Sequence, residues 1–271
     1  MATTVLERRL SDYSEWEPKE YIAEYYSEIL TDCRYASEWL VESMQKTPSV
    51  PVALEFGCGP IPVFTLPLVK KVREIHLAEY LPSNRQEIEK WISGAEDAHD
   101  WRAFTEETLR LEGNDNPSDA EVAARDQETR ARITRVLPAD VTRLDPLGAD
   151  MRGFYPLVTT HCCAEAVTTD KDTWRTYLRN IVSLLKPGGT LILSACEAAP
   201  FYCVRDRRYP CAGVTRHDLP SCLGDLGFGD MDLRVRQVPD NSEQGFSSIV
   251  FARAILGSAG PGTGAAAAAR G

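Results

Sequence analysis

The sequence predicts an α/β protein with a doubly wound, mostly parallel seven-stranded sheet that ends in an antiparallel hairpin. Short apolar segments alternate with longer amphipathic ones along most of the chain. Strands that helices cover on both faces are continuous apolar runs, as these are, whereas half-exposed strands alternate with polar residues. An alternation of such strands with helices is typical of parallel sheets joined by helical crossovers.

Each expected strand is a short apolar run, and the last two form the closing antiparallel pair. In chain order the expected strands are residues 52–56, 74–79, 133–141, a segment within 154–166, 190–196, 231–237 and 247–254. The expected helices repeat their apolar residues about every 3.6 positions. They cover residues 20–45, 63–72, 85–92 and 172–185.

The chain is expected to form one principal domain with extensions. Residues 1–50 supply an N-terminal segment of that domain, and residues 51–256 carry the sheet. Residues 93–132 are charged and polar, so we expect a surface insertion that ends in a solvated charged helix. Residues 257–271 are rich in glycine and alanine and lack the apolar content to fold, which predicts a disordered tail.

The composition argues against several classes of function. The 40 acidic and 30 basic residues give a net charge of −10 at pH 7. Because no basic patch is present, nucleic acid and anionic membranes are not expected as partners. No run of about eighteen apolar residues could cross a membrane, and no apolar signal core follows the N-terminus. We therefore expect a cytoplasmic protein.

The eight cysteines are expected to be buried free thiols. None forms the C-x-x-C pairs of a zinc site, and several lie in apolar runs, as in proteins of a reducing compartment. The adjacent Cys162 and Cys163 cannot easily bind one zinc ion tetrahedrally, and no histidine or asparagine pattern accompanies them as nucleophiles. We expect them to pack in the core, and we expect no metal.

Three strand ends carry residues that could bind a ligand, because doubly wound sheets bind ligands at the carboxyl ends of their strands. Gly57 and Gly59 follow the first strand and let a ligand approach the backbone, although G-x-G alone is as often a plain turn. Glu79 ends the second strand and could accept hydrogen bonds from ribose hydroxyls, or be a surface acid. Asp140 and Val141 end the third strand and suit adenine, while Asp140 could equally cap the next turn.

Together the three strand ends favour a nucleoside ligand. A dinucleotide turn would carry glycine at the sixth position of G-x-G-x-x-G, where this chain has Pro62. This difference counts against a nicotinamide or flavin dehydrogenase. The turn Lys186-Pro187-Gly188-Gly189, which precedes an apolar strand, is instead a mark of class I methyltransferases.

Five stretches make the resemblance specific: EPKEYIAEYY, LEFGCGPIPVF, AEYLPSNRQEIEKW, LPADVTRLDPLG and SLLKPGGTLIL. Over nearly its whole length apart from the tail, the chain resembles the family of small-molecule methyltransferases that includes nicotinamide, phenylethanolamine and thioether N-methyltransferases. The resemblance implies a Rossmann-like fold with an N-terminal helical lid and S-adenosylmethionine as the cofactor, with S-adenosylhomocysteine as its product. It also implies a small-molecule acceptor that is methylated on nitrogen.

The resemblance assigns cofactor-binding roles at matching positions. These positions are Tyr13, Tyr21, Tyr26, Gly57, Cys58, Gly59, Glu79, Asn84, Asp140, Val141 and His161. Tyr21 and Tyr26 would close over S-adenosylmethionine, and Tyr13 would lie in the lid near the acceptor. Glu79 stands where several family members have aspartate, and this departure keeps the carboxylate.

The resemblance also assigns an acceptor side. Its residues are Tyr13, Glu165, Glu197, Phe201 and Tyr202. The expected catalytic residues are Glu165 and Tyr21. Glu165 matches an acidic position at the boundary between cofactor and acceptor, where it could take a proton from a cationic amine. A solvent-exposed glutamate at a helix start is the alternative interpretation of Glu165.

The acceptor itself stays open at this point. Ala195 and Ala199 replace an aspartate and a serine of the nicotinamide enzymes, which puts nicotinamide in doubt. Glu165 and Glu197 favour a cationic acceptor such as an amine, an amino acid or a guanidine. Methylation of oxygen, sulfur or carbon remains an alternative, as does a module that binds cofactor without turnover.

Overall fold

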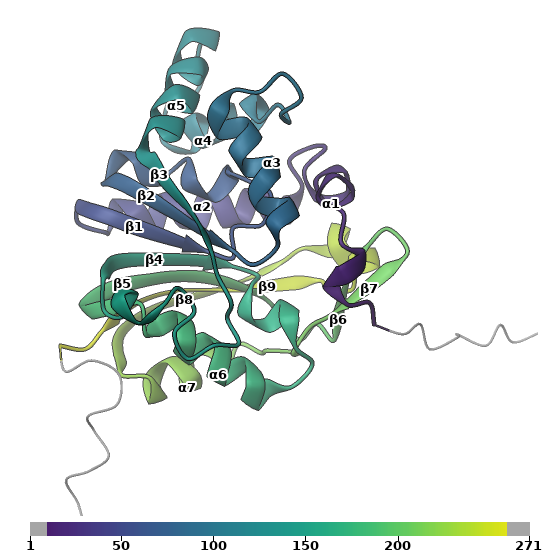
Figure 1. The fold of residues 1–271 in the computed structure, drawn as a ribbon, viewed down its shortest axis with the longest axis vertical. Coiled ribbons are helices and arrows are strands. Elements are labelled where there is room, and N and C mark those ends of the chain that lie inside the picture. Colours follow the sequence, from purple (N-terminus) through teal and green to yellow (C-terminus); the bar gives the residue numbers. More distant parts are fainter. Residues whose placement is uncertain (1–9, 259–271) are drawn as a thin grey trace, which may run out of the picture.

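The computed structural model describes residues 10–258, and these contain a seven-stranded sheet in the order β3-β2-β1-β4-β5-β9-β8 (Figure 1). The strands are β1 (Val50–Phe56), β2 (Val72–Glu79), β3 (Ile133–Pro138), β4 (Tyr155–His161), β5 (Leu185–Cys196), β8 (Phe228–Gln237) and β9 (Ser248–Leu256). The first five run parallel, while β9 is antiparallel to both β5 and β8. The predicted doubly wound sheet with its antiparallel pair is confirmed.

The strand order reverses between β1 and β4, because the chain moves outward from β1 to β3 and then returns to the other side of β1. Loops leave in opposite directions at such a point, and a crevice forms at the carboxyl ends of the strands. This crevice holds the site described below.

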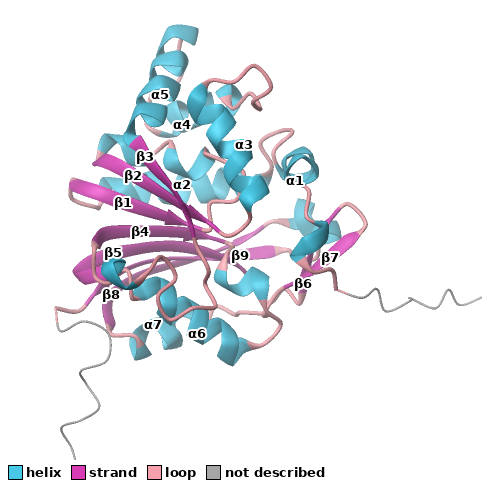
Figure 2. Cartoon of the chain, in the orientation of Figure 1, coloured by secondary structure: helices cyan, strands magenta, loops and turns pink. Residues whose placement is uncertain are grey.

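Helices cover both faces of the sheet (Figure 2). One layer contains α2 (Thr31–Gln45), α3 (Pro82–Ser93), α4 (Arg102–Leu111) and α5 (Asp119–Arg132), and the other contains α6 (Lys171–Val182) and α7 (Asp218–Asp225). Neighbouring residues of a strand face opposite layers. On β1, Ala53 packs into the core cluster that contains Trp39 and Trp91, whereas Leu54 packs into the cluster that contains Trp174.

Two expected helices are wrong in detail. The helix expected over residues 20–45 is broken into α1 (Pro18–Tyr25) and α2, because the ring of Tyr26 turns inward between Trp101 and Phe104, with each ring centroid 5.8 Å away. The helix expected over residues 63–72 is two short 3-10 turns, Val63–Thr65 and Leu68–Lys70. Pro67 lies between these turns and lacks the N–H that a continuous helix would need.

The segment expected as a polar insertion, residues 93–132, has a buried side. Trp101 and Phe104 are buried against the rest of the core. The charged helix α5 also contributes to this side, because Arg125 forms a buried ion pair with Glu112 at 2.6 Å. The polar pattern of this segment therefore describes only its outer face.

A small hairpin was not expected from the sequence. Its strands β6 (Phe201–Val204) and β7 (Arg207–Pro210) pair antiparallel, apart from the main sheet, and lie beside α1 in Figure 1. Within residues 10–258 no helix is long and apolar enough to cross a membrane. Of the tail predicted to be disordered, residues 259–271 lie outside the described part of the chain.

Candidate active site

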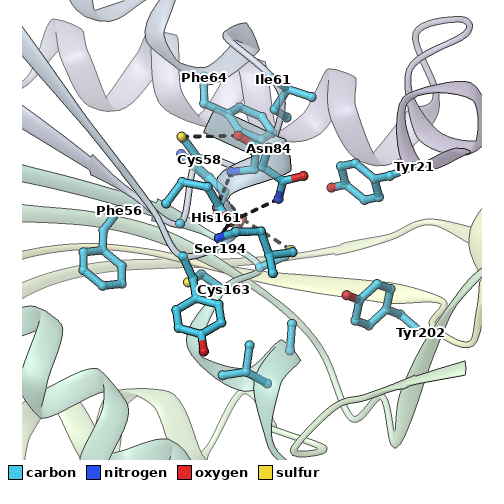
Figure 3. Close-up of a pocket in the computed structure, with 18 of the residues that line it drawn as sticks. Tyr21, Phe56, Cys58, Ile61, Phe64, Asn84, His161, Cys163, Ser194 and Tyr202 are labelled. Carbon is cyan, nitrogen blue, oxygen red and sulfur yellow. Dashed lines mark hydrogen bonds between the residues drawn. The ribbon is translucent and has the colours of Figure 1, made fainter. Parts of the chain in front are cut away.

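A cavity of about 390 Å³ opens at the carboxyl ends of the parallel strands. All of the residues expected to bind cofactor line it, together with Tyr202 from the expected acceptor side. In Figure 3, Tyr21 and Tyr202 lie across the cavity from Cys58 and His161. The volume falls in the range of small-ligand sites.

The glycine turn after β1 forms one wall. Gly57 and Gly59 have φ values of +72° and +60°, which glycine adopts without strain. A Cβ atom on Gly57 would lie 2.2 Å from Sγ of Cys163, whereas a Cβ atom on Gly59 would meet nothing within 4 Å. The turn is therefore packed on one side by Cys163 and open to the cavity on the other.

Glu79 at the end of β2 is held by three donors. Its Oε2 accepts the Gly59 N–H at 3.0 Å, and its Oε1 accepts the Leu81 N–H at 2.8 Å and Nδ2 of Asn84 at 3.1 Å. Burial raises the pKa of this carboxyl. Two carboxylate oxygens offer about four acceptor positions, so one remains for a ligand hydroxyl.

Asn84 connects this carboxylate to a residue that the sequence argument missed. Its Oδ1 accepts the indole N–H of Trp16 at 2.8 Å. Trp16 lies directly before the EPKEYIAEYY stretch and lines the cavity. Its place beside that motif was the signal that could have found it.

Asp140 and Val141 line the cavity after β3. Oδ1 of Asp140 accepts the N–H and the hydroxyl of Thr142, at 3.0 and 2.6 Å. Asp140 therefore caps the next turn, as the alternative interpretation expected, and lines the cavity at the same time. The Val141 carbonyl accepts Nδ2 of Asn180 at 2.9 Å, which anchors this loop to α6.

His161 ends β4 with a buried, neutral ring. Burial lowers the pKa of its imidazole to about 3. Its Nδ1 lies 3.0 Å from Oγ of Ser194, and its ring centroid lies 4.2 Å from that of Phe64. Its Nε2 has no hydrogen-bond partner among the described residues. Ser194 and Phe64 also line the cavity and were not predicted.

Tyrosines close the side of the cavity that faces α1. The ring of Tyr21 lies 5.2 Å from that of Tyr25 and 5.6 Å from that of Tyr26, measured between centroids. The hydroxyl of Tyr13 donates to the Ala166 carbonyl at 2.7 Å and lies 2.8 Å from the hydroxyl of Tyr202. Burial raises the pKa of the Tyr13 and Tyr21 phenols, so both remain neutral donors.

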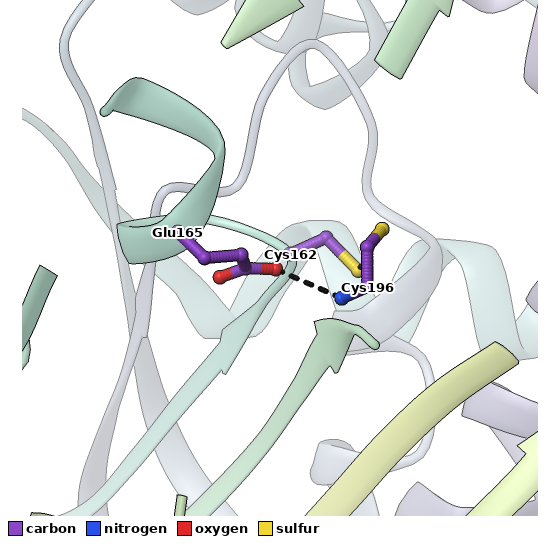
Figure 4. A group of neighbouring side chains, drawn as sticks. All are labelled: Cys162, Glu165 and Cys196. Atoms are coloured by element: carbon purple, nitrogen blue, oxygen red, sulfur yellow. Dashed lines mark hydrogen bonds between the residues drawn. The ribbon is translucent and has the colours of Figure 1, made fainter. Parts of the chain in front are cut away.

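Glu165 lies behind the cavity wall. The side chain is 2% exposed, and its Oε1 accepts the Cys196 N–H at 3.1 Å (Figure 4). Burial raises the pKa of this carboxyl to about 7. The exposed glutamate that was the alternative interpretation is therefore wrong, but Glu165 is not among the lining residues of the large cavity.

Two thiols separate Glu165 from the cavity. Sγ of Cys162 and Sγ of Cys196 lie 3.7 Å apart, and both residues line the cavity. One donor atom from each thiol and one Glu165 oxygen lie within 4.8 Å of one another. The hydrogen bond with Cys162, together with burial, raises the pKa of the Cys196 thiol well above its usual value, so this thiol is protonated.

Besides Glu165, two more residues expected on the acceptor side lie outside the cavity lining. Glu197 forms a two-point ion pair with Arg216, at 2.5 and 2.8 Å, and accepts the Ser248 hydroxyl at 2.9 Å. The Arg216 hydrogen bonds lower the pKa of Glu197. The ring of Phe201 lies under the guanidinium of Arg208 at 4.3 Å. The side chains of Glu197 and Phe201 therefore interact with arginines that do not line the cavity, although both residues are close to Tyr202 in the sequence.

Comparison with known proteins identifies the family. The model of the NNMT/PNMT/TEMT family matches residues 5–249. Mouse indolethylamine N-methyltransferase is 29% identical over 80% of this chain and 83% of its own. Human phenylethanolamine N-methyltransferase is 25% identical over 88% of this chain and 87% of its own, and pig nicotinamide N-methyltransferase is 30% identical over 65% of each.

Solved structures agree on the fold. An S-adenosylmethionine-dependent methyltransferase from Clostridium acetobutylicum superposes with a TM-score of 0.53 at 13% identity, over 89% of this chain and 100% of that one. The N-methyltransferase NodS from Bradyrhizobium japonicum, in complex with S-adenosylhomocysteine, gives 0.51 at 14% identity, over 84% and 89%. The chain belongs to the NNMT/PNMT/TEMT family and is an S-adenosylmethionine-dependent methyltransferase.

Proposed function

We propose that this enzyme transfers the methyl group of S-adenosylmethionine to a nitrogen atom of a small cationic molecule, such as an amine, an amino acid or a guanidino compound. The observation that carries the proposal is that one cavity unites the glycine turn, the Glu79 carboxylate, the Asp140 loop and a wall of tyrosines. The names of the relatives, all N-methyltransferases of small molecules, support nitrogen as the acceptor atom.

The residues present fit the cofactor. Glu79 has acceptor capacity left for a ribose hydroxyl, and Asp140 and Val141 would hold the adenine. Gly57 and Gly59 would let the methionine part approach the backbone, where a side chain on Gly59 would project into the open cavity.

The protein's contribution to catalysis is mainly positional. Bound S-adenosylmethionine supplies a methyl group that its sulfonium already activates. The chain then has to hold the acceptor nitrogen in line with the methyl group and exclude water from the site. Exclusion of water strengthens the electrostatic contacts inside the cavity. The neutral phenols of Tyr13, Tyr21 and Tyr202 can hold polar groups without adding charge.

The acid–base role of Glu165 stays a prediction. A pKa of about 7 suits proton transfer near neutral pH. The carboxyl nevertheless lies behind Cys162 and Cys196, and one of its oxygens is engaged by a backbone N–H. If Glu165→Gln left turnover unchanged from pH 6 to pH 9, the residue would support the wall rather than move a proton.

We propose that the reaction uses no metal ion and that the protein works in a reducing compartment. Transfer from a sulfonium needs no Lewis acid, because the sulfonium already activates the methyl group. All eight cysteines are free thiols, which supports the cytoplasm as the proposed location.

A product screen tests the function. Purified enzyme is incubated with S-adenosylmethionine and a panel of amines, amino acids, guanidines, pyridines, phenols and thiols, and products are identified by mass spectrometry. We expect a gain of one methyl group on a nitrogen compound, with release of S-adenosylhomocysteine. Methylation of only phenols or thiols would overturn the nitrogen assignment. Cofactor binding without any product would favour a binding module.

A further inference from the structure

Two thiols and a carboxylate meet where β4 and β5 end (Figure 4). Cys162 directly follows β4, and Cys196 is the last residue of β5. Glu165 lies in the short turn after Cys162. One oxygen of Glu165 and the two sulfur atoms all lie within 4.8 Å of one another. The methyl transfer proposed above gives neither thiol a role, and thiol and carboxylate ligands gathered in this way are typical of a zinc site.

The two sulfur atoms are spaced like two ligands of one tetrahedral ion. Sγ of Cys162 lies 3.7 Å from Sγ of Cys196. Thiolates bind zinc at about 2.3 Å, so two of them at a tetrahedral angle lie about 3.8 Å apart. A disulfide would instead need the sulfur atoms to approach to about 2.0 Å. The observed spacing therefore suits an ion between the thiols better than a bond.

Glu165 is held beside the thiols by the backbone. Its Oε1 accepts the Cys196 N–H at 3.1 Å. Carboxylates that bind metal ions are themselves commonly hydrogen-bonded, which fixes their direction. Two carboxylate oxygens offer about four acceptor positions, so this bond leaves capacity for an ion. A bound ion would draw the oxygen about 1 Å closer to the sulfur atoms.

The cavity gives an ion access to these three ligands. Cys162 and Cys196 line the cavity, whereas Glu165 is 2% exposed and lies behind them. An ion would enter from the cavity, and its fourth position would face back into it. Water can fill that position, and so can the lining thiol of Cys211, whose pKa is raised by burial and by the neighbouring Glu165 and Cys162. Three protein ligands with one exchangeable position are enough for a zinc site.

The charge of the cavity and the type of ligand atom favour a soft cation. Among the described residues, neither lysine nor arginine lines the cavity, so a divalent ion would meet no side-chain cation on entry. Sulfur ligands favour ions such as Zn²⁺ and Cd²⁺, whereas Mg²⁺ and Ca²⁺ prefer sites made of oxygen atoms. The two thiols therefore decide the class of ion.

The thiols lie on the side of the cavity away from the expected nucleoside position. They follow β4 and β5, whereas Glu79 and Asp140 lie at the ends of β2 and β3, and β1 separates the two pairs of strands. Tyr202, in the hairpin that follows β5, also lines the cavity. An ion on the thiols would therefore take up space of the acceptor rather than of the nucleoside.

We infer that Cys162, Cys196 and Glu165 form a binding site for a soft divalent metal ion such as Zn²⁺, and that an ion bound there keeps the acceptor out of the cavity. The ion is an inhibitor and not a cofactor, so it takes no part in methyl transfer. On binding, each thiol releases its proton to the buffer as a sulfur–metal bond forms. Binding of the ion is independent of the proposed function, whereas its effect on the acceptor rests on that function.

Co²⁺ tests the site, because tetrahedral Co²⁺ with thiolate ligands absorbs visible light. The full-length protein is freed of metal, kept reduced with a phosphine, and titrated with Co²⁺ and then with Zn²⁺. We expect an absorption band that saturates at one ion per chain and disappears as Zn²⁺ displaces Co²⁺. Absence of this band in the wild type would overturn the inference.

Single substitutions locate the ion. Loss of an outer partner of a bound metal costs about 10- to 100-fold in affinity, so loss of a ligand in Cys162→Ser or Cys196→Ser should cost about 100-fold or more for Zn²⁺, and Glu165→Gln at least about 10-fold. Cys163→Ser changes another lining thiol and Cys222→Ser a thiol outside the lining, and both should bind Zn²⁺ like the wild type. Cooperative thermal unfolding without metal shows that each variant is folded. Unchanged Zn²⁺ affinity in Cys162→Ser and Cys196→Ser would refute the site.

Inhibition tests the effect on the acceptor. With an acceptor found in the product screen, Zn²⁺ should raise the KM of the acceptor in the wild type, and a chelator should restore it. Cys162→Ser should need at least about tenfold more Zn²⁺ for the same effect. Equal inhibition of the wild type and Cys162→Ser would overturn the blocking role. If no acceptor is methylated, the proposed function fails, whereas the cobalt and zinc titrations still decide the metal site.

Discussion

Gly57 and Gly59 form a matched pair in which the same substitution should have two different effects. Both residues have positive φ, at +72° and +60°. An alanine side chain at Gly57 would collide with Cys163, whose Sγ would lie 2.2 Å and whose Cβ 2.8 Å from the new atom. At Gly59 the same atom would enter open space that belongs to the cavity.

The expected losses of stability have two causes: the positive φ at both glycines and the clash with Cys163 at Gly57 alone. An alanine in the left-handed region costs about 1 kcal/mol at either position. Overpacking against Cys163 adds about 2 kcal/mol at Gly57, since the turn is held by the Gly57 N–H bond to the Ala78 carbonyl at 2.8 Å. We expect Gly57→Ala to lower the melting temperature by about 9 °C and Gly59→Ala by about 3 °C.

Thermal and urea unfolding measure stability, and calorimetry measures binding of S-adenosylhomocysteine. Gly59→Ala should lose more affinity for this ligand than stability, because its methyl group occupies space in the cavity. Adding Cys163→Ala to Gly57→Ala should restore part of the lost stability, relative to Cys163→Ala alone. Equal destabilisation by both glycine variants, or no recovery in the double variant, would refute the steric reasoning.

Three further predictions concern side chains. Burial raises the pKa of Glu165 to about 7, above its ordinary 4.5, so the folded wild type holds a proton that the unfolded chain releases between these pH values. In urea unfolding, the wild type should therefore lose about 3 kcal/mol of stability from pH 4.5 to pH 8 relative to Glu165→Gln. Parallel pH profiles of the two proteins would contradict this. Glu197→Gln should cost about 1 kcal/mol of stability by weakening the ion pair with Arg216. The KM values of S-adenosylmethionine and of the acceptor should each change less than twofold. Tyr202→Phe should raise the KM of the acceptor about fivefold by removing one of the two hydrogen bonds of the Tyr13 hydroxyl, and adding Tyr13→Phe should cause little further change.

The strand ends were predictable because they depend on local rules. An apolar run followed by Gly-Cys-Gly-Pro predicts a buried strand and a tight turn, and β1 ends at Phe56 as expected. Glu79 likewise ends β2, as the run before it indicates. Parallel strands bring their carboxyl ends together, so residues at these ends meet in space without any knowledge of packing.

The helices were predicted less well, because periodicity does not report where a side chain finds its partner. Tyr26 continues the helical repeat in the sequence but packs between Trp101 and Phe104, and the helix ends there. No glycine or proline marks that break. The partners come from residues 93–132, whose polar composition predicted a solvated surface.

The sequence by itself determined the doubly wound sheet and the strand ends that line the cavity on the side proposed to bind cofactor, because strand ends are set by local patterns and converge through topology. Only the tertiary structure decided which of the residues expected on the acceptor side face the cavity. It turned Glu197 toward Arg216 and placed Glu165 behind two thiols. The physical reason is that whether a carboxylate faces a cavity depends on which distant donors reach it, and sequence spacing does not record such contacts.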